Sequence, residues 1–228
     1  MGCGMALLLY GITNPEANLL PGPGVCGSVV QSREAFGLRI YCSEVADPEG
    51  CLGTPESLKK AALQFHEVLR NILATATPIP FPFPTLLESV DKLEEYLASQ
   101  QEHCRAALAA LGNAVQYELV ASWAADEQAD LATPISGREY LKRRQETAGR
   151  TASVDNKLKA VTAGMVRDWR ARQERRNHRW FALVARDERD RFIAALKSAA
   201  PSQGVRLRLS GPWPPSEFVA PRGEDGQP

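Results

Sequence analysis

The chain has 228 residues, of which 44% are hydrophobic and 24% are charged, and its formal net charge is zero. This composition is ordinary for a globular protein that can bury a sizeable core. No apolar run reaches the ~18–20 residues of a membrane span, so a transmembrane helix is excluded.

The charges are unevenly distributed along the chain. Residues 1–130 contain 7 Lys/Arg and 16 Asp/Glu, a net charge of −9, whereas residues 131–228 contain 20 and 11, a net charge of +9. Such a dipolar layout favours head-to-tail contact between copies or separate partners for each half. A basic helical face that simply lies in water is the alternative.

The N-terminal sequence MGCGMALLLYGIT does not match a targeting segment. Its apolar run is short and no Lys or Arg precedes Arg33, unlike a secretory signal. Ala6 stands where a myristoylation motif needs Ser or Thr. We therefore expect a cytoplasmic protein.

Five cysteines stand at positions 3, 26, 42, 51 and 104. Their number is odd and no pair has the spacing C-x-x-C, which matches neither a zinc site nor a disulfide framework. We therefore expect reduced thiols.

The first half of the chain begins with a continuous apolar run at residues 5–12, which predicts a strand buried on both faces. Weaker strand patterns follow near residues 25–31 and 36–45. A helix is predicted over residues 55–73, because Thr54 can cap it and Pro55 suits the first helical position.

The stretch TPIPFPFPT at residues 77–85 places Ile79, Phe81 and Phe83 on one face of an extended segment. Pro80, Pro82 and Pro84 alternate with them and cannot donate hydrogen bonds, so the stretch should be an edge strand or pair incompletely with a sheet.

A second helix is predicted to about residue 110. A capping box formed by Thr85 and Glu88 would begin it, and Gly112 suits a left-handed end.

The second half begins with a half-buried strand at residues 115–123. From a capping box at Ser136 and Glu139 to about residue 178, the pattern predicts helix with a break near Gly149. The chain then reads as a strand at 180–186, a helix, and a strand at 205–210.

Strands interleaved with helices predict an α+β fold with two domains, each with its own mixed sheet and helices packed on one face. The hinge is placed at residues 111–113. The N-terminal domain is then 1–112, the C-terminal domain is 113–220 with a long helical insertion, and the polar tail 221–228 is expected to be disordered.

No enzyme motif is present. His66 begins a zinc-protease pattern, but Arg70 replaces its second histidine, and no glycine-rich phosphate loop precedes a helix. We expect no catalytic residue, metal or cofactor.

The arginine-rich segment 167–179, predicted as helix, leaves nucleic-acid binding as an alternative function. Asp168 and Glu174 interrupt that segment and the whole chain is neutral, which argues against it.

The closing stretch LSGPWPPSEFV resembles the end of the gas vesicle protein family GvpF/GvpL, which typically reads Gly-Pro-Trp-Pro-Pro-Tyr-Ser-Phe-Val. Ser216 and Glu217 depart from that pattern. The blocks LLLYGI, ATPIPFPFPTLL, GNAVQYELV and GREYLKRRQ resemble other family segments in the same order. Within them, Pro82 replaces the usual Arg and Pro84 the usual Gly.

The resemblance implies two α+β domains, the second ferredoxin-like, and no enzymatic activity. It implies an accessory or minor structural protein of gas vesicles. Such a protein assists assembly by binding the main shell protein GvpA and other gas vesicle proteins. Its expected location is the gas vesicle and the cytoplasm, with no nucleic-acid or membrane partner.

Candidate partner-binding residues are apolar side chains of the two proline-rich stretches: Trp213, Pro214, Pro215, Phe218, Phe81 and Phe83. Exposed aromatic side chains are typical anchors of protein interfaces. The alternative is structural: Trp213 and Phe218 close the end of a sheet, and the prolines hold the chain flat against it.

Overall fold

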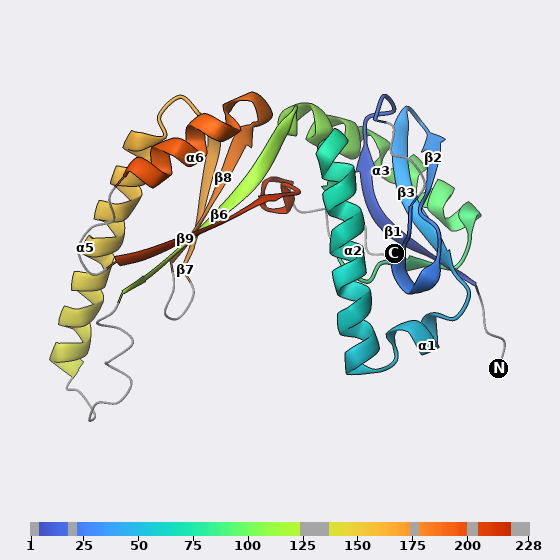
Figure 1. Cartoon of the computed structure of the whole chain (residues 1–228), viewed down its shortest axis with the longest axis horizontal. Helices are drawn as coiled ribbons and strands as arrows, with labels where there is room; N and C mark the ends of the chain where they lie inside the picture. Colours follow the sequence, from blue (N-terminus) through green and yellow to red (C-terminus); the bar gives the residue numbers. More distant parts are fainter. Residues whose placement is uncertain (1–4, 18–21, 124–136, 174–177, 200–204, 220–228) are drawn as a thin grey trace. The chain divides into compact units, whose positions relative to one another are not determined.

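The computed structural model describes residues 5–17, 22–123, 137–173, 178–199 and 205–219 (Figure 1). The chain forms two compact units, one of Met1–Val115 with Trp213–Pro228 and the other of Gln116–Pro212. The predicted hinge at residues 111–113 lies close to this division, while the chain from Trp213 onward groups with the first unit. Within the described residues, no helix is long and apolar enough to cross a membrane.

The first unit is built on a five-stranded sheet in the order β2-β3-β1-β4, with β5 also paired to β1. All its strand pairs are antiparallel. The side chains of β1 are buried from Leu7 to Thr13, so the prediction of a strand covered on both faces is confirmed. The strands are β1 (Ala6–Thr13), β2 (Gln31–Ala35), β3 (Leu38–Val45), β4 (Ile79–Pro80) and β5 (Leu86–Leu87).

The helices of this unit are η1 (Val25–Gly27), α1 (Pro48–Leu52), α2 (Pro55–Thr75) and α3 (Val90–Leu111). The predicted cap of α2 is confirmed, because the Thr54 side chain accepts a hydrogen bond from the Ser57 backbone N–H. The predicted capping box of Thr85 and Glu88 is wrong. Residues 86 and 87 pair with β1 instead, and α3 begins later, capped by Ser89.

Helices lie on both sides of the first sheet (Figure 1). Towards α2, the Phe65 ring packs between Tyr10 and Phe83, with centroid distances of 5.3 and 5.0 Å. Towards α3, the Phe81 and Tyr96 rings lie 5.9 Å apart. The α+β class is thus confirmed. In this unit the helices cover both faces of the sheet, whereas one face was predicted.

The second unit has the element order strand–helix–strand–strand–helix–strand and the sheet order β7-β8-β6-β9. This is the ferredoxin-like arrangement, which confirms the predicted class of the C-terminal domain. The elements are β6 (Ala114–Trp123), α5 (Gly137–Val161), β7 (Val166–Gln173), β8 (His178–Ala185), η2 (Arg186–Glu188), α6 (Arg189–Ser198) and β9 (Val205–Trp213).

The helix predicted from the Ser136 and Glu139 box to about residue 178 is confirmed as far as Val161 and is wrong beyond it. Helix α5 passes Gly149 without a break and ends at Val161, and Gly164 (φ 78°) lies in the turn that follows. The arginine-rich helix therefore does not exist, because most of its residues form strand β7, paired antiparallel with β8. The proposed cap at Ser136 and the tail 221–228 lie outside the described residues.

The expectation of reduced thiols is also wrong for two cysteines. Cys26 and Cys51 form a disulfide, with Cα atoms 6.0 Å apart. Their sequence separation of 25 residues matches no known cysteine motif. The two cysteines come together because η1 and α1 lie close in the folded unit. Cys42 and Cys104 are buried free thiols, and Cys3 lies outside the described residues.

Helix α5 is anchored to the second sheet by a buried indole. Trp180 on β8 is 2% exposed, and its Nε1–H donates to Asp155 Oδ1 over 3.0 Å. The Lys159 ammonium lies 2.8 Å from Asp155 Oδ2. One carboxylate therefore satisfies a buried donor and orients the helix on the sheet.

We expect Asp155→Ala to lower the free energy of unfolding by about 1–3 kcal/mol, because it leaves the buried Trp180 N–H without its acceptor. Asp155→Asn keeps an acceptor oxygen, so its free energy of unfolding should fall markedly less. Urea denaturation followed by tryptophan fluorescence measures both changes. Equal losses in the two variants would contradict the assigned role of this hydrogen bond.

Candidate partner-binding surface

The closing segment, residues 213–219, begins at Trp213, the last residue of β9, which is an edge strand of the second sheet. An edge strand tolerates Pro212, which has no N–H to donate. Gly211 precedes it with φ 126°, and the Gly211–Pro212 peptide bond is cis. A Cβ at Gly211 would lie 2.9 Å from Gln116 O and from a ring carbon of Tyr117, so only glycine lets β9 approach β6 this closely.

The closing segment folds back on itself by local hydrogen bonds. The Ser216 N–H donates to Pro214 O over 2.8 Å, and the Phe218 N–H donates to Pro215 O over 3.0 Å. The second bond has the spacing of a 3-10 helix and belongs to the short helix η3 (Ser216–Phe218). The segment therefore has a defined conformation and is not a free polyproline ligand.

Trp213 is the most prominent apolar side chain of this segment, with 40% of its surface exposed. Pro214 and Phe218 are half-buried and Pro215 is buried. An indole combines a large apolar area with one polar N–H, a combination found often at interfaces. Among the candidates of the closing segment, Trp213 is therefore the exposed aromatic side chain, beside half-buried Pro214 and Phe218 and buried Pro215.

The other two candidates, Phe81 and Phe83, lie in the core of the first unit. Phe81 is 3% exposed and Phe83 is half-buried. The Phe81 N–H donates to Tyr10 O and Thr85 O accepts from the Leu9 N–H, so this proline-rich stretch pairs incompletely at the sheet edge, as predicted. In this conformation their rings serve packing, and partner binding by them stays a prediction.

Sequence reasoning missed an exposed aromatic residue, Phe36. It occupies the two-residue turn between β2 and β3 with φ 53°, followed by Gly37 with φ 67°, and is 42% exposed. The Arg105 guanidinium donates to its carbonyl oxygen. The dipeptide Phe-Gly between two strands could have indicated this turn, because tight hairpin turns need positive φ at both central positions and glycine adopts it readily.

The arginines of β7 belong to a sheet face. The register places Arg172 opposite Arg179 and Arg170 opposite Phe181, so these side chains share one face. The neighbouring Trp180 points to α5, so the face lies on the other side of the sheet from that helix.

This face also contains an acidic member. Arg179 Nη1 lies 2.7 Å from Glu118 Oε1, and the Ser210 hydroxyl donates to Glu118 Oε2 over 3.2 Å. This polar network links β8, β6 and β9.

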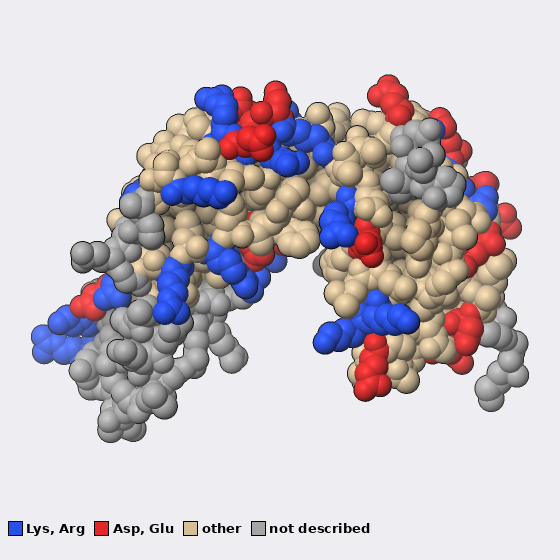
Figure 2. Space-filling view, viewed as in Figure 1, with Lys and Arg blue, Asp and Glu red and all other residues tan. Residues whose placement is uncertain are grey.

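The charge separation seen in the sequence follows the two units. The first unit carries 8 Lys/Arg and 15 Asp/Glu, a net charge of −7, and the second carries 19 and 12, a net charge of +7. Figure 2 shows many Lys and Arg side chains over the second unit and acidic side chains along the rim of the first. Each unit can thus attract a partner of opposite charge.

The described part of the chain holds no group of three or more His, Cys, Asp or Glu side chains that could bind a metal ion. His178 packs edge-on against Trp123, with ring centroids 5.4 Å apart, and lies 6.1 Å from Trp180. It is therefore a packing residue of the second unit.

The two-unit fold has close structural relatives among gas vesicle proteins. The crystal structure of GvpF from Anabaena sp. PCC7120 matches with a TM-score of 0.76 and 15% identity, covering 95% of this chain and 99% of that one. GvpF from Microcystis aeruginosa matches with a TM-score of 0.74 and 14% identity, covering 94% and 99%. These likenesses establish the fold as that of GvpF.

The sequence comparison establishes the family. The family model described as gas vesicle synthesis protein GvpL/GvpF matches residues 6–220, and the chain belongs to this family. Gas vesicle protein L1 of Halobacterium salinarum is 24% identical over 255 residues, covering 93% of this chain and 88% of that protein. The resemblance first seen in the closing motif is therefore confirmed along nearly the whole chain.

We expect Gly211→Ala to lower the free energy of unfolding by about 2 kcal/mol, because the added Cβ meets β6 and the backbone keeps a positive φ. Gly149→Ala is the matched control. Its Cβ would meet nothing within 4 Å in α5, so it should raise stability by about 0.5–1 kcal/mol. Urea denaturation followed by circular dichroism measures both, and an unchanged Gly211→Ala protein would argue against the close approach.

Proposed function

We propose that this protein acts in gas vesicle assembly by binding the main shell protein and other gas vesicle proteins. The match of the GvpL/GvpF family model to residues 6–220 carries this proposal. Its proposed location is the gas vesicle and the cytoplasm, and we propose no catalytic role for it.

The proposed contact for the main shell protein is the closing segment, through Trp213, Pro214, Pro215 and Phe218. The resemblance implies that the shell protein is small and hydrophobic, and such a partner requires accessible apolar surface. Trp213 supplies that surface on a segment with a defined backbone. Phe81 and Phe83 would act indirectly, by holding the core of the first unit.

The opposite net charges of the two units support more than one partner. A basic sheet face on the second unit suits an acidic surface, and the acidic first unit suits a basic one. Other gas vesicle proteins could therefore bind independently of the shell protein.

The test is co-purification of the tagged protein with the main shell protein, co-expressed from the same source. Wild type is compared with Trp213→Ala/Phe218→Ala and with Leu63→Ala, a control that removes a 64% exposed apolar side chain from α2. Circular dichroism checks that each variant folds. We expect wild type and Leu63→Ala to retain the shell protein and the double variant to lose at least about 10-fold, since hot-spot aromatics each contribute on the order of 2 kcal/mol.

Retention of the shell protein by the folded double variant would contradict the assigned surface and favour the structural role of the closing motif. Absence of binding by wild type would contradict the proposed function itself. Loss by both the double variant and Leu63→Ala would show that binding depends on apolar surface in general.

A further inference from the structure

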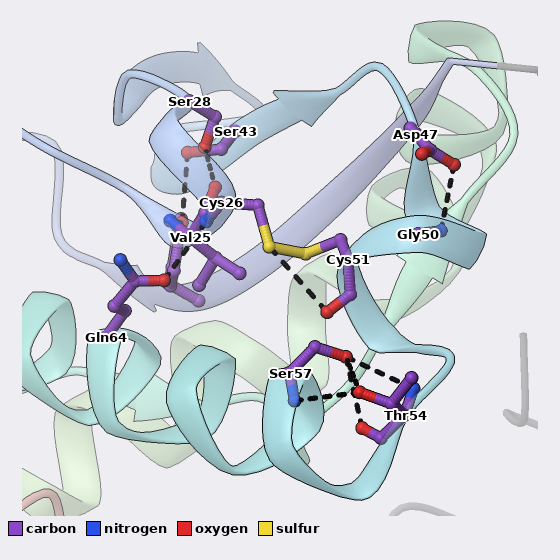
Figure 3. Close-up of a disulfide and its surroundings, with 11 residues drawn as sticks. Val25, Cys26, Ser28, Ser43, Asp47, Gly50, Cys51, Thr54, Ser57 and Gln64 are labelled. Atoms are coloured by element: carbon purple, nitrogen blue, oxygen red, sulfur yellow. Dashed lines mark hydrogen bonds between the residues drawn. A yellow bond between two sulfur atoms is a disulfide. The ribbon is translucent and has the colours of Figure 1, made fainter.

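A disulfide joins two short elements of the first unit. Cys26 lies in η1 and Cys51 in α1, with 25 residues of sequence separation between them (Figure 3). Neither cysteine belongs to the closing segment. The bond therefore has a role separate from the proposed partner surface.

The two sulfur-bearing residues differ in accessibility. Cys26 is exposed, whereas Cys51 is 9% exposed and packs in the core cluster with Tyr10 and Phe65. Beside Cys26, a Cβ added to Gly27 would meet nothing within 4 Å, so that side of η1 is open space. A reagent in solution can therefore reach the Cys26 side of the bond more readily than the Cys51 side.

The backbone of η1 is held by bonds that do not involve sulfur. The Cys26 N–H donates to Gln64 Oε1 over 3.1 Å (Figure 3). The Val25 N–H donates to the Tyr10 hydroxyl over 3.0 Å. Val25 is fully buried, and the Ser28 hydroxyl donates to its carbonyl oxygen over 2.6 Å. Cys26 would therefore keep its position after the disulfide opens.

The position of helix α1 depends on the disulfide more than the position of η1 does. It has five residues and a cap at Asp47, whose side chain accepts from the Gly50 N–H over 2.9 Å. So short a helix is not stable by itself. The disulfide ties it to η1, so opening the bond should loosen α1 while leaving η1 in place.

We propose that the Cys26–Cys51 disulfide is a thiol-exchange site, at which a small-molecule thiol attacks the Cys26 sulfur. The attacking thiolate forms a new S–S bond to Cys26 Sγ, the Cys26–Cys51 bond breaks, and Cys51 leaves as a thiolate that takes a proton from water. A second thiol then attacks the mixed disulfide at the sulfur of the first. Cys26 is released as a thiol, and the two small thiols leave as their own disulfide.

The reaction is balanced as a two-electron exchange: the protein disulfide is reduced and two thiols are oxidised. It runs in reverse with an oxidised small disulfide. The carbonyl oxygen of Cys51 lies 3.9 Å from Cys26 Sγ, where it can accept a weak hydrogen bond from the released Cys26 thiol. The bond can form again when Cys51, on the loosened α1, returns to this contact with Cys26.

The other described cysteines do not compete for this chemistry. Cys42 and Cys104 are buried, with 0% and 1% exposure. Burial raises the pKa of the Cys42 thiol, which keeps it protonated and unreactive. Exchange among the described cysteines is therefore confined to the Cys26–Cys51 pair.

The test uses the full chain with Cys3→Ser, which removes the one cysteine outside the described residues. The protein is prepared without reductant, treated briefly with glutathione, quenched with acid and mapped by peptide mass spectrometry. We expect the glutathione adduct on the Cys26 peptide, several-fold over the Cys51 peptide. Full reduction should lower the Tm by about 10 °C, because a loop of this length is no longer closed.

The matched control is Cys26→Ser/Cys51→Ser in the same background, whose Tm should not respond to glutathione. Treatment of reduced protein with oxidised glutathione should restore the Tm of the untreated protein. Three results would each overturn the proposal: alkylation of both cysteines before any reductant is added, an adduct found mainly on Cys51, or a Tm that reduction leaves unchanged.

Discussion

The first unit depends on one strand, β1, which is hydrogen-bonded on both edges and covered on both faces. It pairs with β3 along one edge and with β4 and β5 along the other. Because its side chains are buried from Leu7 onward, every neighbouring element must supply apolar surface or a matched polar group. The Tyr10 hydroxyl shows the second case, since it accepts from the Val25 N–H and donates to Ser43. The proline-rich stretch at residues 77–85 is tolerated here because it pairs only incompletely with β1 at the sheet edge, where its prolines are not needed as donors.

The second unit shows where sequence patterns succeed and where they stop. Strands β6 and β8 were predictable because their apolar residues fit the two-residue period of a strand and do not fit the period of a helix. Strand β7 was missed because its arginines fit a solvated helix face as well as a strand, and only pairing with β8 decides between them. The disulfide was missed for a related reason: contact between η1 and α1 depends on the whole first unit.

The candidate surface was partly predictable. The motif at residues 211–215 indicated a segment with a constrained backbone, because a glycine followed by prolines and tryptophan restricts the φ angles. The sequence could not distinguish exposed from buried aromatics, since Phe81 and Phe83 stand in a proline-rich stretch much like Trp213. The structure separates them through packing, with Phe81 against Tyr96 and Phe83 against Phe65. A motif thus locates a constrained segment, whereas exposure depends on the neighbours that the fold supplies.

The two prolines after Trp213 have an entropic consequence for recognition. A flexible terminal segment loses backbone freedom when it binds, and that loss reduces the affinity gained from its contacts. Pro214 and Pro215 have their φ angles restricted in the free protein, and two local hydrogen bonds hold the residues that follow. The indole is therefore presented on a preorganised support. When a partner covers the indole, this segment loses little conformational entropy. Even a small apolar contact at this position can therefore keep most of the free energy gained by removing its apolar surface from water.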